Sequence, residues 1–140
     1  GILVSQKVLL TWLIESEELF HQIEKYITPE DFSEGLFRKV AELLYEQYEK
    51  HEANPAQIMN HFTDEEEHRE VAALFNTRIR EIKTVHEQEK ALKETIIRVK
   101  KNSIEEHSAK LDPTDIQGLQ KLMEAKRALQ DLEKLHISIN

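Results

Sequence analysis

The sequence has 140 residues, a formal net charge of −8 and no cysteine. This length suffices for one helical domain, or for a small domain with an appendage. The lack of cysteine excludes disulfides, thiolate zinc sites, iron–sulfur clusters and thiol nucleophiles, and the negative charge disfavours duplex-DNA binding by the chain as a whole. No apolar run approaches the roughly 18 residues of a membrane span. We therefore expect no membrane partner and a cytoplasmic location.

The composition predicts an all-α protein whose two halves differ. Only three glycines and three prolines occur, and charged residues make up 33% of the chain, a mixture that disfavours sheets and tight hairpins. All aromatic residues precede residue 76. Residues 1–75 carry 16 acidic and 6 basic side chains, whereas residues 76–140 carry 11 and 13. These differences predict a globular bundle followed by extended aliphatic helices.

In chain order, the sequence of the front half predicts five helices and one short turn. The helices cover residues 5–14, 17–26, 33–51, 55–60 and 64–75, and the turn lies at 29–32. Apolar residues recur every three or four positions in these segments, as they do on the buried face of a helix. Each of the three prolines falls where a helix is expected to start, a position at which the missing N–H costs nothing. These prolines are Pro29, Pro55 and Pro113.

Two longer helices follow, over about 84–111 and 113–135. In the first, the apolar stripe shifts phase near residues 100–103, which predicts a kink or a change of packing partner, with flexibility there. In the second, an apolar stripe is expected at Leu119, Leu122, Ala125, Leu129, Leu132 and either Leu135 or His136. Some of these leucines must seal the hairpin internally, and the sequence does not determine which. The two helices can pair as an antiparallel hairpin.

The predicted organisation is thus a bundle subdomain over 1–100 and a helical hairpin over 101–140, joined through the long helix of about 84–111. A hairpin beyond a complete core suggests a docking element. An equally compatible alternative is that the hairpin folds back onto the bundle.

The sequence gives little support for catalysis. It has no phosphate-binding glycine loop, no H-E-x-x-H and no serine in a glycine-flanked turn. Three E-x-x-H pairs, at Glu18, Glu65 and Glu133, leave a carboxylate and histidine metal-binding bundle as the alternative function. The abundance of glutamate weakens that signal.

A basic cluster on the long helix is better explained as a solvated face than as a nucleic-acid contact. Glutamates alternate with it at helical spacing, and no aromatic residue lies among its members, so we expect no stacking on single strands. The cluster comprises Lys90, Lys93, Arg98, Lys100 and Lys101.

Three blocks in order resemble the C-terminal helicase-binding domain of bacterial DNA primase: LLTWLI at 9–14, IEKYITPEDF at 23–32 and LFRKVAELLY at 36–45. The resemblance covers essentially the whole chain. The proline–acidic–phenylalanine block is also similar to the N-terminal domain of the replicative helicase, which shares that fold. A chain that ends in the hairpin, with no ATPase motor after it, favours the primase.

The resemblance implies that the hairpin docks on the N-terminal domains of the hexameric replicative helicase. It would thereby recruit primase to the replication fork, while the bundle modulates helicase activity. The primase's catalytic and zinc-binding groups belong to other domains, so we expect this chain to be non-enzymatic, free of cofactors and monomeric alone. The candidate partner-binding residues are Leu111, Ile116, Leu119, Leu122, Met123, Lys126, Arg127 and Leu135.

Overall fold

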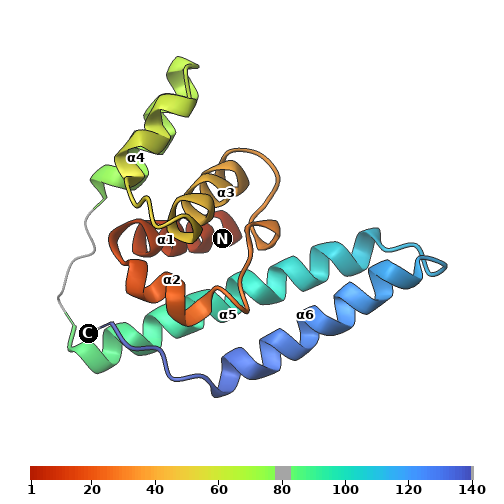
Figure 1. The fold of residues 1–140 in the computed structure, drawn as a ribbon. Coiled ribbons are helices and arrows are strands. Elements are labelled where there is room, and N and C mark those ends of the chain that lie inside the picture. The colour runs from red at the N-terminus through yellow and green to blue at the C-terminus, as the bar shows by residue number, and fades with distance from the viewer. Residues whose placement is uncertain (78–82, 140) are drawn as a thin grey trace.

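The structure, a computed structural model, describes residues 1–77 and 83–139 (Figure 1). Within those residues the chain forms helices and no strand, which confirms the all-α prediction. The helices are α1 (Ile2–Glu15), α2 (Glu17–Ile23), η1 (Pro29–Asp31), α3 (Leu36–Glu49), η2 (Pro55–His61), α4 (Glu65–Asn76), α5 (Val85–Lys110) and α6 (Ile116–Lys134), where η denotes a 3-10 helix.

Helix α3 starts three residues later than predicted, because Ser33 is used elsewhere. The backbone N–H of Ser33 donates to Oε1 of Gln6 (3.0 Å), and Nε2 of Gln6 donates back to the Ser33 hydroxyl (2.9 Å). Gly35 then turns the chain with φ +114°, a conformation that side-chain-bearing residues rarely adopt. The amide of fully buried Gln6 is thereby satisfied.

Helix α6 also starts later than predicted, at Ile116 rather than beside Pro113. Asp112 closes a tight turn by accepting the backbone N–H of Thr114 (2.9 Å). Asp115 is the residue that caps the helix, since its carboxylate accepts the N–H of Gly118 (3.0 Å). An aspartate at this position satisfies a backbone donor that the helix itself leaves unpaired.

The core of the molecule forms around α1, which contacts α2, α3, α4 and α5. Phe20 packs edge-on against Tyr45, with 4.9 Å between the ring centres, and at 5.0 Å against Tyr48. Both buried hydroxyls find carbonyl acceptors: Tyr45 donates to Ile27 (2.7 Å) and Tyr48 donates to Leu13 (2.6 Å). The aromatic front half therefore builds a closed core, as its composition predicted.

The base of the hairpin belongs to this same core. Leu132 of α6 and Ile137 beyond it are 1% and 2% exposed and join the buried cluster. The chain after α6 then returns to α2, where the Gln22 side chain exchanges two hydrogen bonds with the Ser138 backbone, at 2.7 and 2.9 Å. The alternative that the hairpin packs against the bundle is thus correct for its base.

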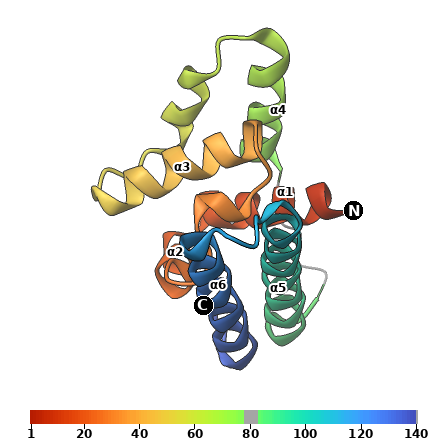
Figure 2. The same cartoon turned by 90° about the vertical axis from the view of Figure 1, so that its right-hand side faces the viewer.

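The tip of the hairpin stands apart. Between Ser103 and Leu132, none of the described residues is buried. Figure 1 shows the turn between α5 and α6 lying beyond the other helices, and Figure 2 shows α5 and α6 running side by side. A hairpin anchored at one end therefore presents the outer face of α6 to solvent.

Candidate docking surface

Helix α6 has two opposite faces with different surroundings. The inner face, at Leu122, Ala125, Leu129 and Leu132, is half-buried to buried. The outer face carries a stripe at steps of three and four residues, which places its members one above the other. We call this the outer stripe, and its members are Ile116, Leu119, Met123, Lys126 and Arg127, all of them exposed.

The outer stripe is apolar over its N-terminal part. The side chains of Ile116, Leu119 and Met123 are 70%, 39% and 71% exposed. The sequence put Leu119 in the apolar stripe of this helix and also among the candidate partner-binding residues. The structure places its side chain on the outer face, whereas the inner face begins at Leu122. A contiguous exposed apolar patch with a polar rim is typical of an interaction site.

Three of the predicted partner-binding residues lie away from the outer stripe. Leu111, at the turn, is half-buried and packs so close to α6 that a Cβ on Gly118 would lie 2.6 Å from its Cδ1. Leu122 lies on the inner face, and Leu135 packs against the core. The sequence could not separate these residues, because the hairpin's seam and its outer face share the same helical spacing.

Charge is distributed unevenly along the outer stripe. Lys126 and Arg127 lie at its C-terminal end, and neither has an ion pair or hydrogen bond to another residue within 1–77 and 83–139. Asp115 caps the other end of α6 and Asp112 precedes it, but both side chains line the side of the hairpin that faces the bundle, away from the outer stripe. Hydrogen bonds from the Thr114 backbone and hydroxyl lower the pKa of the Asp112 carboxyl and hold it ionised.

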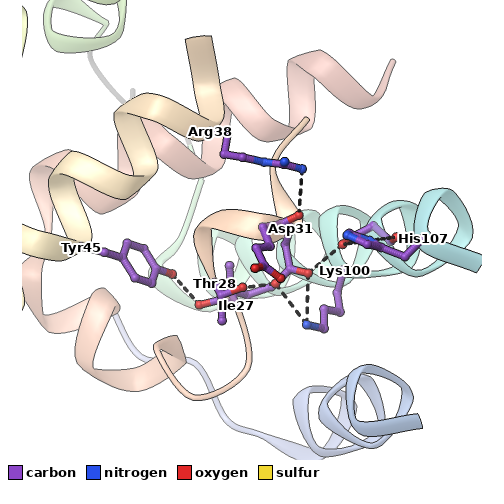
Figure 3. A network of polar contacts seen from close by, with 9 residues as sticks. Ile27, Thr28, Asp31, Arg38, Tyr45, Lys100 and His107 are labelled. Carbon is purple, nitrogen blue, oxygen red and sulfur yellow. Dashed lines mark hydrogen bonds and ion pairs between the residues drawn. The ribbon is translucent and has the colours of Figure 1, made fainter. Parts of the chain in front are cut away.

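The hairpin's orientation is fixed by a buried polar network at the middle of α5 (Figure 3). Nζ of Lys100 lies 3.2 and 3.1 Å from the two carboxylate oxygens of Asp31 in η1. The Ser103 hydroxyl donates to Oδ1 (2.7 Å), and the Thr28 backbone N–H donates to Oδ2 (2.8 Å). Both oxygens of the buried carboxylate are therefore satisfied twice.

This network corrects two predictions. Lys100 was assigned to a solvated basic face, but it is only 5% exposed. Residues 100–103 were predicted to kink or flex, whereas α5 is continuous from Val85 to Lys110. Helix α5 contacts α1, η1 and α6, and its contact with α6 already includes Lys93, before residues 100–103. The available signal was that Lys100 and Ser103 follow Ile96 at steps of four and seven, and so continue its buried face.

A groove of about 590 Å³ lies between the hairpin and the segment that joins α2 to η1. Tyr26 lines it from the bundle side, and Ile104 and Leu122 line it from α5 and α6. Asp31 and Lys100 also line it. The other charged side chains of its lining are also of both signs, so the groove offers no strong charge of one sign to a ligand.

The three E-x-x-H pairs are not brought together. His21 contacts Glu17 and Glu24, at 3.2 and 3.4 Å, rather than Glu18. Nδ1 of His68 lies 3.1 Å from the carbonyl oxygen of Phe62. Within the described residues, no group of three acidic, histidine or cysteine side chains is placed to hold a metal ion.

The fold and this surface together define an all-helical chain with one exposed, partly apolar helix face. Comparison with protein-family models, with curated proteins and with solved structures gives no match. Across the described part of the chain, no helix has the length and apolar character that crossing a membrane requires.

Proposed function

We propose that this chain is the helicase-binding domain of a bacterial DNA primase, and that the tip of its hairpin docks on the N-terminal domains of the hexameric replicative helicase. The docked domain recruits primase to the replication fork, and the bundle modulates helicase activity. In this proposal the chain is an interaction module of the cytoplasm. RNA-primer synthesis belongs to other domains of the parent protein.

The observation that carries the proposal is the exposure of the outer stripe on an anchored hairpin. The apolar side chains of Ile116 and Met123 lie mostly in solvent. Leu132 of the same helix, by contrast, is buried in the core. Anchoring at Asp31 and Lys100 limits the entropy that a partner must pay to order the hairpin. Unpaired Lys126 and Arg127 suit an acidic partner surface, which they would steer and orient.

The test is a calorimetric titration of the chain against the N-terminal domain of the cognate replicative helicase, and in parallel against the hexamer. Reversing two charges of the outer stripe, Lys126→Glu with Arg127→Glu, is expected to weaken binding about tenfold, or roughly 1.4 kcal/mol. The physical reason is that like charges then meet across the interface.

The matched control reverses two exposed lysines on the groove side of the same hairpin, Lys110→Glu with Lys121→Glu. This control changes the net charge by the same amount as the Lys126→Glu, Arg127→Glu variant but leaves the outer stripe intact. The affinity of the control for the helicase should therefore stay within about twofold of the native value. Circular dichroism checks that both variants keep their helices. Equal loss in both variants contradicts the outer stripe as the dock, and no binding of the native chain to either helicase form contradicts the function.

Point substitutions are preferable to removing the hairpin. A chain cut after Asn102 would lose Leu132 and Ile137, both of which are buried in the bundle core. Loss of binding by such a fragment would therefore not distinguish a missing dock from a damaged core.

A further inference from the structure

We propose that the segment after α6 is a strap that ties this helix to the bundle, and that α6 and the segment open and close together as one unit. We call residues 135–139 the tail strap. Its regulatory meaning rests on the proposed function, whereas its opening is measured on the chain alone. Contacts of the tail strap with two elements far away in the sequence, α2 and α5, carry the proposal.

The tail strap is bound through its backbone. The side-chain amide of Gln22 in α2 donates to the carbonyl oxygen of Ser138 (2.7 Å) and accepts the N–H of the same residue (2.9 Å). One residue further on, the N–H of Ile139 donates to the carboxylate of Glu89 near the start of α5 (3.0 Å). Figure 1 shows the chain after α6 returning to this part of the molecule. Both α2 and α5 therefore hold the tail strap.

Apolar side chains fix the tail strap in place along this path. Ile137 is 2% exposed and belongs to the buried core, and Ile139 packs against the same cluster. Between them, Gln22 pairs with both backbone groups of Ser138, as a neighbouring strand would. The tail strap thus has one defined position on the bundle rather than a general affinity for it.

Helix α6 depends on the tail strap because little else joins it to the bundle. Of the residues of α6, all of which the structure describes, only Leu132 is buried. The main contact of this helix is with α5, and at its C-terminal end Nζ of Lys93 donates to the Glu133 carbonyl oxygen (2.7 Å). Helices in proteins are stabilised mainly by tertiary packing. With the tail strap released, α6 would keep only its seam with α5.

The tail strap is held by few interactions, so we expect it to open without unfolding of the whole molecule. Its residues lie in no helix, and ordering their backbone costs conformational entropy. Burial of Ile137 and the hydrogen bonds to Gln22 and Glu89 offset that cost. Segments with few buried contacts open at the low end of the free-energy range of local unfolding.

Opening of the tail strap changes the proposed docking surface. When the tail strap leaves α2, the outer stripe of α6 loses its fixed orientation. A partner that binds only the oriented stripe favours the closed state, and by reciprocity the closed state strengthens its binding. Gln22 thereby acts as a positioning residue for a surface that it does not touch, and it links that surface to the bundle.

The test is amide hydrogen exchange of the full chain, resolved by residue with NMR, under conditions in which the exchange rate reports the opening equilibrium. We follow Ile139 in the tail strap, Leu129 in α6 and Leu10 in the core of α1. After correction for intrinsic rates, Ile139 and Leu129 should show similar protection. Both should exchange at least about 100-fold faster than Leu10.

The variant Gln22→Ala removes both hydrogen bonds to Ser138. It should accelerate exchange at Ile139 and at Leu129 by the same factor, about tenfold, because opening then breaks two fewer bonds. The matched control, Gln120→Ala, removes an exposed glutamine from α6 itself and should change both rates by less than about twofold.

Three outcomes overturn the proposal. Unequal acceleration of Ile139 and Leu129 means that the tail strap opens without α6. Unchanged exchange of both means that Gln22 does not hold them. Exchange of Leu129 as slow as that of Leu10 in the native chain means that α6 opens only when the whole molecule unfolds. None of these outcomes affects the helicase titration, which tests the function separately.

Discussion

At the scale of single residues, the ion pair of Asp31 and Lys100 is the most consequential feature. Both side chains are about 6% exposed, and removing two charges from water is costly unless hydrogen bonds replace the lost solvation. Ser103 and the Thr28 backbone supply those bonds. The main effect of the pair is therefore to fix the position of α5 against η1. Its net contribution to the free energy of unfolding is small.

Replacing only the lysine, with Lys100→Met, leaves the Asp31 carboxylate buried without its counter-charge. We expect a loss of about 3 kcal/mol in the free energy of unfolding by urea. The double variant Asp31→Asn with Lys100→Met should lose clearly less than the sum of the two single variants. Strict additivity would show that the two groups are not coupled in solution.

A second residue-scale prediction concerns alkaline pH. Burial, with a smaller contribution from Glu17, raises the pKa of Tyr48 to about 12, above its ordinary value of 10. The folded state therefore holds the proton more tightly than the unfolded state. The stabilisation is complete below pH 10 and is lost as the pH rises from 10 towards 12, at roughly 1.4 kcal/mol per pKa unit.

Urea unfolding at several pH values from 8 to about 11.5 measures this loss. Tyr48→Phe removes the titrating hydroxyl, so its stability should fall less steeply above pH 10 than that of the native chain. Burial also raises the pKa of Tyr45, which leaves part of the slope in the variant. Identical slopes in the two proteins would contradict the buried hydroxyl.

At the scale of elements, α5 serves two partners with two adjacent faces. Leu92, Ile96 and Val99 are buried in the core with α1. On another face, Lys93 donates to the Glu133 carbonyl of α6 (2.7 Å). The phase shift that the sequence shows near residues 100–103 does not interrupt the helix, which is continuous from Val85 to Lys110.

Helix α6 allows a matched pair of leucine substitutions. Leu132→Ala removes a fully packed side chain and should cost about 2–5 kcal/mol of the free energy of unfolding. Leu119→Ala, on the exposed outer stripe, should cost well under 1 kcal/mol. Thermal or urea unfolding measures both changes. Similar small losses would mean that the base of the hairpin is not part of the core.

At the scale of the whole molecule, one core unites the two predicted parts. The buried cluster contains Phe20 from the front half together with Leu132 and Ile137 from the end of the chain. Between Ser103 and Leu132, none of the described residues belongs to that cluster. The hairpin is therefore exposed at one end and anchored in the core at the other, as the proposed docking role requires.

The sequence by itself determined the helical class, the order of helices and the hairpin, because helix periodicity, caps and prolines are local signals. It did not determine which leucines of α6 face inward, since both faces repeat every three or four residues. Only the tertiary structure decided that Leu119 lies outside, that Leu135 lies against the core, and that Lys100 is buried. Those outcomes depend on contacts between residues far apart in the chain, such as Asp31 with Lys100 and Gln22 with Ser138. Local spacing carries no information about such pairings.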